Sequence, residues 1–317
     1  MSDTRYRSAR PIRVGLQLVG AQVLDPVRWA RAAEAAGFDI VMVADHIGPD
    51  RHAPMLNLTA MATATERIRI GTYVLNNDMR HPVQLAWEAA TLDRISGGRF
   101  ELGLGAGHSG HEYAEVGIPF DPPAARKARL REAVEIIRPL LDGETVDFAG
   151  EHYRVEGAAV TRALQERMPI LVGSQGAAML RHIGAHADGV GLIGLGRTLP
   201  DGHRHTVSWA LDRLDQQVAQ VREGAAVHDR AIDFSALVQV CEVTDDREAA
   251  LAETIDEEGG ITEEIAAVTP YMAIGSVEEI AAHFRAGHDR WGITTFVVRC
   301  PTPEKIAAFA PVLSSLP

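Results

Sequence analysis

A histidine and an aspartate close the second long apolar run of the sequence, at the position where a strand would end. His46 follows Asp45, and the apolar run before them begins at Phe38. A histidine in this place can exchange a proton near neutral pH with a bound molecule, and Asp45 can orient the imidazole or cap the following loop. A turn capped by Asp45 beside an exposed His46 is the competing structural interpretation. The pair therefore indicates either an acid–base site or an ordinary turn.

The next apolar run, Gly71–Asn77, ends in two asparagines. The side-chain amides of Asn76 and Asn77 can both donate and accept hydrogen bonds, which suits contact with a polar heterocycle. The same pair also suits a simple turn, so both interpretations stay open at this point.

Glycines occupy alternate positions at the end of the fourth apolar run. Gly103, Gly105 and Gly107 are followed directly by His108. Alternate residues of a strand share one face, so these glycines would leave that face bare and let a flat ligand lie against the backbone. His108 is then a second candidate for proton transfer, and a flexible glycine loop is the structural alternative. The pattern is not a Rossmann fingerprint, because no clear crossover unit follows it.

Small residues connect the fifth apolar run to the helix pattern that follows it. Gly173, Ser174, Gln175 and Gly176 form this turn. Such a turn directs several free N–H groups toward one point, and the positive end of the helix dipole favours an anion there. The segment thus predicts a phosphate-binding site, and a helix start capped by Ser174 is an equally good structural interpretation.

Other chemically active residue types look structural. The segment His203-Arg204-His205 is similar to a metal-binding pair of histidines, but it lies in a polar stretch before a helix pattern. We interpret it as a solvated helix start. No set of His, Asp and Glu at the ends of apolar runs forms a convincing metal site, and no GxSxG segment supports a nucleophilic hydrolase. We therefore expect no bound metal.

The elements that must position these groups alternate regularly along the chain. Eight apolar runs are expected as strands, at Arg13–Gly20, Phe38–Ala44, Arg67–Leu75, Arg99–Gly105, Pro169–Gly173, Asp188–Ile193, Phe234–Val243 and Ile293–Arg299. The runs between them are expected as helices, among them one that opens at Pro26 and ends at Gly37, and a later one over Val207–Arg222.

Eight strand–helix units favour an α/β fold, a single (β/α)8 TIM barrel with insertions. A doubly wound sheet shows the same alternation, but the count reaches eight and no GxGxxG follows the first strand. We expect one domain over residues 1–317, with an inserted hairpin at about 145–156 and lid-like loops at about 194–205 and 262–272. In such barrels functional groups lie at the carboxyl ends of the strands, where the candidate residues are found.

Composition narrows the classes of partner. The 317 residues carry a formal net charge of -12, from 43 acidic and 31 basic side chains. Nucleic acids and anionic membranes are disfavoured, because binding them needs clustered Lys and Arg. The polar stretch Met1–Arg10 lacks an apolar signal core, and no run is as long as a membrane span, so a cytoplasmic protein is expected.

Taken together, these segments resemble the luciferase-like superfamily, and within it the coenzyme F420-dependent oxidoreductases. The resembling segments are Ala44-Asp45-His46, Gly71–Asn77, His81-Pro82, Thr91–Arg99, Gly103–Gly107, Gly173–Gly176, Ala187–Gly189 and Gly275–Ile280. The similarity covers nearly the whole chain. It implies a luciferase-like TIM barrel with insertions, usually dimeric, that binds a flavin or deazaflavin at the carboxyl ends of its strands.

The resemblance also implies roles for individual residues. His46 would lie beside the cofactor ring and take part in proton transfer or substrate polarisation, with His108 as a second catalytic candidate. Tyr73 and Val74 would form a bulge behind the ring, which in this family contains a non-proline cis peptide bond. The full set of expected cofactor contacts is Asp45, His46, Thr72, Tyr73, Val74, Asn76, Gly105, Gly107, His108, Gly173, Ser174, Gln175 and Gly176.

Two further implications concern the phosphate and the acid–base group. Ser174, Gln175 and Gly176 would hold the cofactor phosphate. The chain departs from the pattern at His108, where several well-known F420 enzymes carry Glu. This departure leaves the identity of the acid–base group open and weakens any transfer of substrate from those enzymes.

The leading functional hypothesis is F420-dependent hydride transfer to or from a small organic substrate. An FMN-dependent two-component monooxygenase, which takes reduced flavin from a separate reductase, is the alternative. A barrel that binds flavin without turnover is a third, weaker hypothesis. A separate flavin or F420 reductase is a candidate partner. The resemblance favours a homodimer, and the apolar residues Val83, Leu85, Ala86 and Trp87 could serve either the core or a dimer interface.

Overall fold

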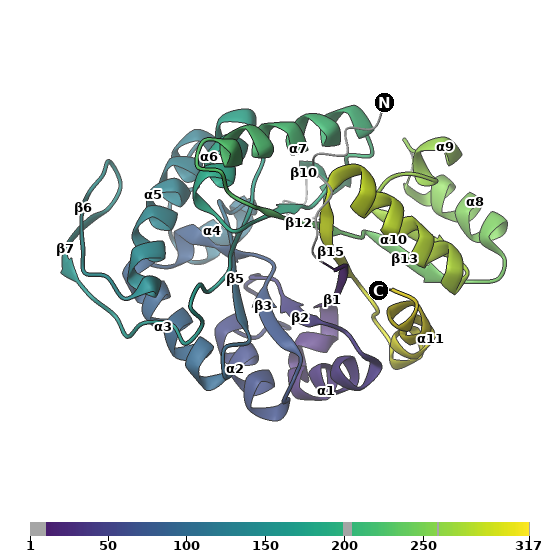
Figure 1. Cartoon of the computed structure of the whole chain (residues 1–317), viewed down its shortest axis with the longest axis horizontal. Helices are drawn as coiled ribbons and strands as arrows, with labels where there is room; N and C mark the ends of the chain where they lie inside the picture. The colour runs from purple at the N-terminus through teal and green to yellow at the C-terminus, as the bar shows by residue number, and fades with distance from the viewer. Residues whose placement is uncertain (1–10, 199–204, 259, 317) are drawn as a thin grey trace.

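The computed structural model describes residues 11–198, 205–258 and 260–316. A closed barrel of parallel strands forms the centre of the molecule, and helices surround it (Figure 1). The eight barrel strands are β1 (Arg13–Leu18), β2 (Ile40–Val43), β3 (Arg69–Thr72), β5 (Phe100–Gly105), β8 (Ile170–Gly173), β9 (Gly189–Leu192), β12 (Asp233–Leu237) and β15 (Ile293–Val298). The circle closes where β15 pairs with β1 and β3 pairs with β5. The expected (β/α)8 barrel is confirmed.

Several of the helices begin or end at residues with a local reason to do so. They are α1 (Pro26–Ala36), α2 (Pro54–Ala64), α3 (Pro82–Ile95), α4 (Gly110–Glu115), α5 (Pro123–Asp142), α6 (Ala177–His186), α7 (Leu211–Ala226), α8 (Arg247–Glu258), α9 (Glu263–Ala266), α10 (Val277–Trp291) and α11 (Pro303–Ser314). Pro26 suits the first helical position of α1, and Gly37 ends that helix with a φ of 94°. Among the described residues, none of the helices is long and apolar enough to cross a membrane.

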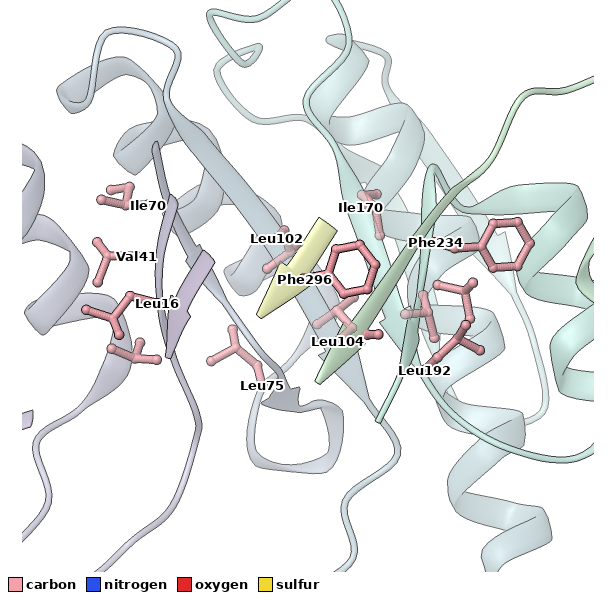
Figure 2. Close-up of a cluster of buried hydrophobic side chains, with 14 of the residues drawn as sticks. Leu16, Val41, Ile70, Leu75, Leu102, Leu104, Ile170, Leu192, Phe234 and Phe296 are labelled. Carbon is pink, nitrogen blue, oxygen red and sulfur yellow. The ribbon is translucent and has the colours of Figure 1, made fainter. Parts of the chain in front are cut away.

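The main core is the layer between the strands and the helices. Figure 2 shows Leu16, Val41 and Ile70 on one side of the neighbouring strands β1, β2 and β3. All three side chains have 0% exposure. Burial of such aliphatic side chains stabilises the fold by roughly 1.5–3 kcal/mol each. Alternation along each strand sends the intervening residues toward the barrel axis, where a ligand at one end could meet them.

The barrel interior is charged at the amino ends of its strands. Arg13 Nη1 lies 2.7 Å from Glu101 Oε1, and Arg69 Nε lies 2.5 Å from the same oxygen. Burial alone would raise the pKa of Glu101, but the two guanidinium groups outweigh it and lower that pKa. A separate apolar cluster occupies the axis beyond this layer, made of Ile40, Met42, Tyr73, Leu237 and Val297. The apolar cluster therefore separates the charged residues at the amino ends of the strands from the polar residues at the carboxyl ends.

The third expected strand is interrupted. The run expected over Arg67–Leu75 forms β3 and then the short β4 (Leu75–Asn76). The peptide bond between Tyr73 and Val74, which lies between these strands, is cis. The non-proline cis bond thus lies where the resemblance places it.

The seventh expected strand, Phe234–Val243, leaves the barrel halfway. Its first part is β12, and its second part is β13 (Val240–Val243), which pairs in parallel with β14 (Met272–Gly275). The N–H of Val238 still bonds a carbonyl of β15, whereas the N–H of Gln239 bonds the carbonyl just before β14. The prediction of one continuous strand is therefore wrong, because the backbone changes its hydrogen-bonding partner between these two residues.

Two antiparallel pairs are inserted between barrel elements. They are β6 (Val146–Ala149) with β7 (Arg154–Ala158), and β10 (Leu195–Thr198) with β11 (His205–Val207). The first pair projects from the molecule at the left of Figure 1. The second pair occupies part of the segment expected as a lid-like loop, and the helix expected from Val207 begins at Leu211 because Val207 belongs to β11.

Candidate active site at the mouth of the barrel

His46 is held at the carboxyl end of β2 by a carboxylate from α4. Its Nδ1 lies 2.7 Å from Oε1 of Glu112. The side chain of Glu112 is 5% exposed and that of His46 is 36% exposed. A carboxylate at Nδ1 accepts the hydrogen on that nitrogen and fixes the tautomer, so Nε2 is the nitrogen left to act on a ligand. The structure therefore presents His46 as an oriented imidazole.

Two further histidine rings lie next to His46 in a row of ring contacts. The ring of His108, which follows β5, lies edge-on to that of His46 with centroids 5.6 Å apart. The ring of His205 lies 4.6 Å from that of His108, centroid to centroid. Burial, with His205 and His46 adding to it, lowers the pKa of His108 to about 4. At neutral pH His108 is thus a neutral imidazole that can form hydrogen bonds without carrying charge.

The position of His205 corrects an interpretation made from the sequence. The solvated helix start expected at His203-Arg204-His205 is wrong for its last residue, because His205 lies in β11 against His108. The other two residues lie outside the described part of the chain. The strand pair β10–β11 is what carries this imidazole to the site.

Asp45 and Asn76 hold the loops around the mouth together. Both carboxylate oxygens of Asp45 accept from Arg80, and one of them also accepts from the N–H of Asn76. Oδ1 of Asn76 accepts in turn from the N–H of Asp78 and from the hydroxyl of Tyr113. These bonds fix the segment after β4 against the segment after β2. A contact between either residue and a cofactor stays a prediction.

Thr72 and Asn77 also have protein partners. The hydroxyl of Thr72 donates to the carbonyl of Gly103 at 2.8 Å and accepts from its N–H at 2.7 Å. Nδ2 of Asn77 donates to the hydroxyl of Tyr153 at 3.2 Å. With 1% exposure and its hydroxyl used twice, Thr72 fixes β3 against β5.

The strand-end glycines make room for protein atoms. A Cβ on Gly105 would lie 2.7 Å from Val74 Cγ2, and one on Gly173 would lie 3.3 Å from Val74 Cγ1. A Cβ on Gly103 would lie 2.0 Å from the carbonyl oxygen of Thr72. The expectation that Gly103 and Gly105 bare a face for a flat ligand is therefore corrected. The face is covered by the segment that contains the cis peptide bond.

Gly107 is required by the turn that delivers His108. Its φ is 71°, and a Cβ there would lie 2.2 Å from the hydroxyl oxygen of Tyr113. The buried Arg126 of α5 donates to the carbonyl of Gly107. The turn is held on both sides, so the location of His108 is fixed by packing.

The turn after β8 presents an open helix start. No side chain caps α6, and its N-cap residue, Gly176, has a φ of 96°. A Cβ on Gly176 would lie 3.2 Å from Nζ of Lys127, which comes from α5. Free backbone N–H groups, the positive end of the helix dipole and a lysine nitrogen therefore meet in one place. This is the physical basis of an anion site.

Gln175 braces this turn. Its Nε2 donates to the carbonyl of Leu195 in β10 at 2.8 Å, and its Oε1 accepts from Arg213 of α7 at 2.5 Å. Both ends of the amide are committed to protein. The side chain of Ser174, by contrast, makes no hydrogen bond within the described part of the chain.

Four residues enter the site that the sequence analysis did not assign to it: Glu112, Lys127, His205 and Arg213. Glu112 carried a signal, since it lies four residues after His108 and the segment between them starts a helix. The other three come from helices or strands whose approach depends on packing between distant segments, which residue spacing does not encode.

The fold and the site place the chain among parallel eight-stranded barrels with ligand chemistry at one end. The family model for luciferase-like monooxygenase matches residues 9–294. The chain belongs to the luciferase-like monooxygenase family.

Curated relatives with similar sequences are F420-dependent glucose-6-phosphate dehydrogenases. The one from Mycobacterium avium is 36% identical over 217 residues, which is 65% of this chain and 60% of that protein. The one from Gordonia bronchialis is 32% identical over 248 residues, which is 74% of this chain and 68% of that protein. Matches to five such relatives span between 55% and 63% of their length.

Solved structures share the whole architecture. An F420-dependent tetrahydromethanopterin reductase from Methanopyrus kandleri has a TM-score of 0.73 at 23% identity, covering 96% of this chain and 97% of that one. A monooxygenase from Streptomyces bottropensis has a TM-score of 0.76 at 21% identity, covering 96% and 99%. At these identities the similarity establishes the fold.

Proposed function

We propose that the chain is an oxidoreductase that transfers a hydride between coenzyme F420 and a small organic substrate. One geometric observation carries the proposal: an uncapped helix start and an oriented histidine, His46, lie at the same end of the barrel. The names of the curated relatives support F420 as the cofactor. FMN is the alternative, because its phosphate would suit the same helix start.

The residues after β8 fit the cofactor phosphate. A side chain at position 176 would occupy the space in front of Lys127 Nζ, and Gly176 leaves that space open. The first N–H groups of α6 have no side-chain cap, so they remain donors for an anion. We infer that Gly176, Ser174 and Lys127 bind the phosphate and that Gln175 positions the turn.

The histidines would manage the proton. F420, when bound, supplies a deazaflavin ring that accepts or donates a hydride. Glu112 holds Nδ1 of His46, so His46 would hold or release the accompanying proton at Nε2. His108, neutral at physiological pH, would orient a polar group of the substrate by hydrogen bonding.

A titration of the purified protein with F420 and with FMN, followed by anaerobic turnover, tests the proposal. We expect F420 to bind at least about tenfold more tightly than FMN, a difference near 1.4 kcal/mol, and turnover to proceed without oxygen. Tighter FMN binding with oxygen-dependent turnover would instead establish the monooxygenase. If either cofactor binds but no substrate of a broad panel is turned over, the hypothesis of a barrel that binds flavin without catalysis would be supported.

We further infer that the chain forms one domain and that segments 194–205 and 262–272 enclose the substrate. The contact between His205 of β11 and His108 supports this arrangement for the first of the two segments. Limited proteolysis in the presence of F420 and substrate should slow cleavage within both segments. Cleavage at an unchanged rate would count against a lid.

We also infer a cytoplasmic homodimer that works with a separate reductase. Trp87 of α3 supports the dimer, because its side chain is 60% exposed and borders a groove of about 880 Å³ shared with Arg154 and Val160. Leu85 and Ala86 of the same helix are buried in the core and serve the fold instead.

A further inference from the structure

Arg299 is a guanidinium inside the barrel mouth without a carboxylate partner. It follows β15, and its Nε donates to Gln17 Oε1 at 2.8 Å while its Nη1 donates to Gln239 Oε1 at 3.1 Å. Among the described residues, no carboxylate forms an ion pair with it. At the opposite end of the barrel, by contrast, Arg13 and Arg69 both form ion pairs with the carboxylate of Glu101. The positive charge of Arg299 is therefore balanced by neutral amide oxygens only.

The two glutamines hold this guanidinium in a fixed orientation. Nε2 of Gln17 donates to the carbonyl of Tyr73 at 2.9 Å, and Nε2 of Gln239 donates to the carbonyl of Ile193 at 2.7 Å. These bonds to the backbone turn both Oε1 atoms toward Arg299. The direction of the remaining N–H groups is thus set before any ligand arrives, which is how a site for an anion is preorganised.

The remaining N–H groups are available to a ligand. Arg299 has five donors, of which the glutamines take two. Its Nη2 has no protein partner in the described part of the chain and is not among the side-chain atoms sealed from solvent without a partner. Burial lowers the pKa of Arg299, and Tyr73 nearby offsets this effect only in part. A buried guanidinium without a carboxylate partner is best stabilised by an anionic oxygen that approaches from the open mouth of the barrel.

We propose that Arg299, braced by Gln17 and Gln239, is a binding site for a negatively charged oxygen of the molecules that occupy the barrel mouth. The site rests on the proposed function, since it requires cofactor and substrate at this end. Two sources share the chemistry. One is the cofactor ring, which would carry the negative charge of the hydride that it accepts as long as no proton is added to it, and the other is an anionic group of the substrate.

The test compares wild type with Arg299→Gln and Arg299→Met in three measurements: the Kd of oxidised F420, the Kd of reduced F420 and the KM for substrate. If the anion belongs to the ring, both variants weaken reduced F420 at least tenfold more than oxidised F420. If the anion belongs to the substrate, both cofactor forms bind as in wild type and KM rises at least tenfold. Either result supports the site.

Thermal melting separates a binding site from a structural strut. Removal of a charge without a carboxylate partner should leave the Tm of Arg299→Met at or above that of wild type. A sharply lower Tm, or variants that do not fold, would overturn the proposal, because Arg299 would then hold Gln17 and Gln239 in place. Wild-type Kd and KM values in both variants would overturn it as well.

A matched control uses a barrel arginine that has a carboxylate partner. Arg13→Met should lower Tm and leave all three binding measurements unchanged, because Arg13 pairs with Glu101 at the amino ends of the strands. If wild type binds FMN in place of F420, the proposed cofactor fails, and the same comparison with oxidised and reduced FMN still decides the role of Arg299.

Discussion

Nδ1 of His46 is joined to Oε1 of Glu112 across a distance of 2.7 Å, with the carboxylate buried and the imidazole open to the barrel mouth. We expect Glu112→Gln to lower kcat by about 10- to 100-fold, because an amide, which can donate as well as accept, does not select the Nδ1–H tautomer or fix the imidazole as the carboxylate does. The Kd of F420 should stay within about twofold of wild type, a change near 0.4 kcal/mol. Steady-state kinetics and a fluorescence titration measure the two quantities.

His46→Ala extends this prediction. It should reduce turnover at least as strongly as Glu112→Gln, and the double variant should be no slower than His46→Ala, since the two residues act as one unit. His111→Ala is the control, because His111 is on the same helix but exposed and paired with Glu115. An unchanged kcat in His46→Ala would remove the pair from the mechanism.

A side chain at the start of α6 should block the phosphate. We expect Gly176→Val to weaken F420 binding at least about tenfold, near 1.4 kcal/mol, because the Cβ would stand in front of Lys127 Nζ. Gly97→Val is a matched control: Gly97 also has a positive φ, of 68°, but a Cβ there would meet no atom within 4 Å, and the residue is remote from the mouth. A native melt with unchanged affinity in Gly176→Val would place the phosphate elsewhere.

The close packing of Val74 predicts a compensating pair. Gly105→Ala should destabilise the protein by about 1–3 kcal/mol, because its Cβ would lie 2.7 Å from Val74 Cγ2. Val74→Ala removes that methyl group, so the double variant should be more stable than Gly105→Ala alone. Urea unfolding of the four proteins measures this coupling. Additive losses would show that the clash is relieved in another way.

The environment of His108 predicts a loss of stability in acid. Its pKa falls to about 4 in the folded protein, because of burial, His205 and His46. The unfolded chain, with an ordinary pKa near 6.5, binds the proton more readily between these values. The stability that His108 contributes is therefore complete above about pH 6.5 and is lost as the pH falls toward 4. We expect His108→Gln to reduce the acid loss by on the order of 1–3 kcal/mol.

The control for this pH dependence is His182→Gln. Burial, followed by the charge of His186, also lowers the pKa of His182 to about 4, and His182 lies in the second half of α6, away from the turn at Gly176. Its variant should reduce the acid loss similarly while kcat stays normal. Urea unfolding between pH 4 and 7 measures both effects, and parallel curves for wild type and His108→Gln would contradict the assignment.

The exposed indole on α3 predicts a change of oligomeric state. Trp87→Glu places a charge where the side chain is 60% exposed, so the fold should survive while a dimer that uses this face dissociates. Light scattering at micromolar concentration should give a dimer for wild type and a monomer for the variant. A monomeric wild type would remove the dimer from the proposal.

The sequence predicts the barrel well because strand alternation and helix ends are local. Pro26 and Gly37 bound α1 as expected, and the eight strands occur in the expected order. The exit of the seventh strand after Val238 was not predictable, since residues 240–243 are as apolar as a barrel strand and the choice of β14 as partner is made by tertiary pairing.

The site was predictable where its residues end strands. The strand ends predicted where His46 and His108 lie, and the small residues predicted the turn at Gly176; the roles of these residues stay predictions. The role of the strand-end glycines was not predictable, because it depends on a tertiary contact. The side chain of Val74 fills the face that Gly105 leaves bare. Arg299 was assigned to a strand in the sequence, and only the arrangement of Gln17 and Gln239 reveals its missing counterion.

The strand pair β10–β11 makes part of the mouth separable from the barrel itself. It enters between β9 and α7, so its length and composition can change without disturbing the register of any barrel strand. Because it delivers His205 to His108, exchanging this insertion would alter the proton affinity of a residue that the scaffold itself holds still. A strand pair of different sequence at this place would thus change the acidity at the mouth while the barrel strands stay as they are.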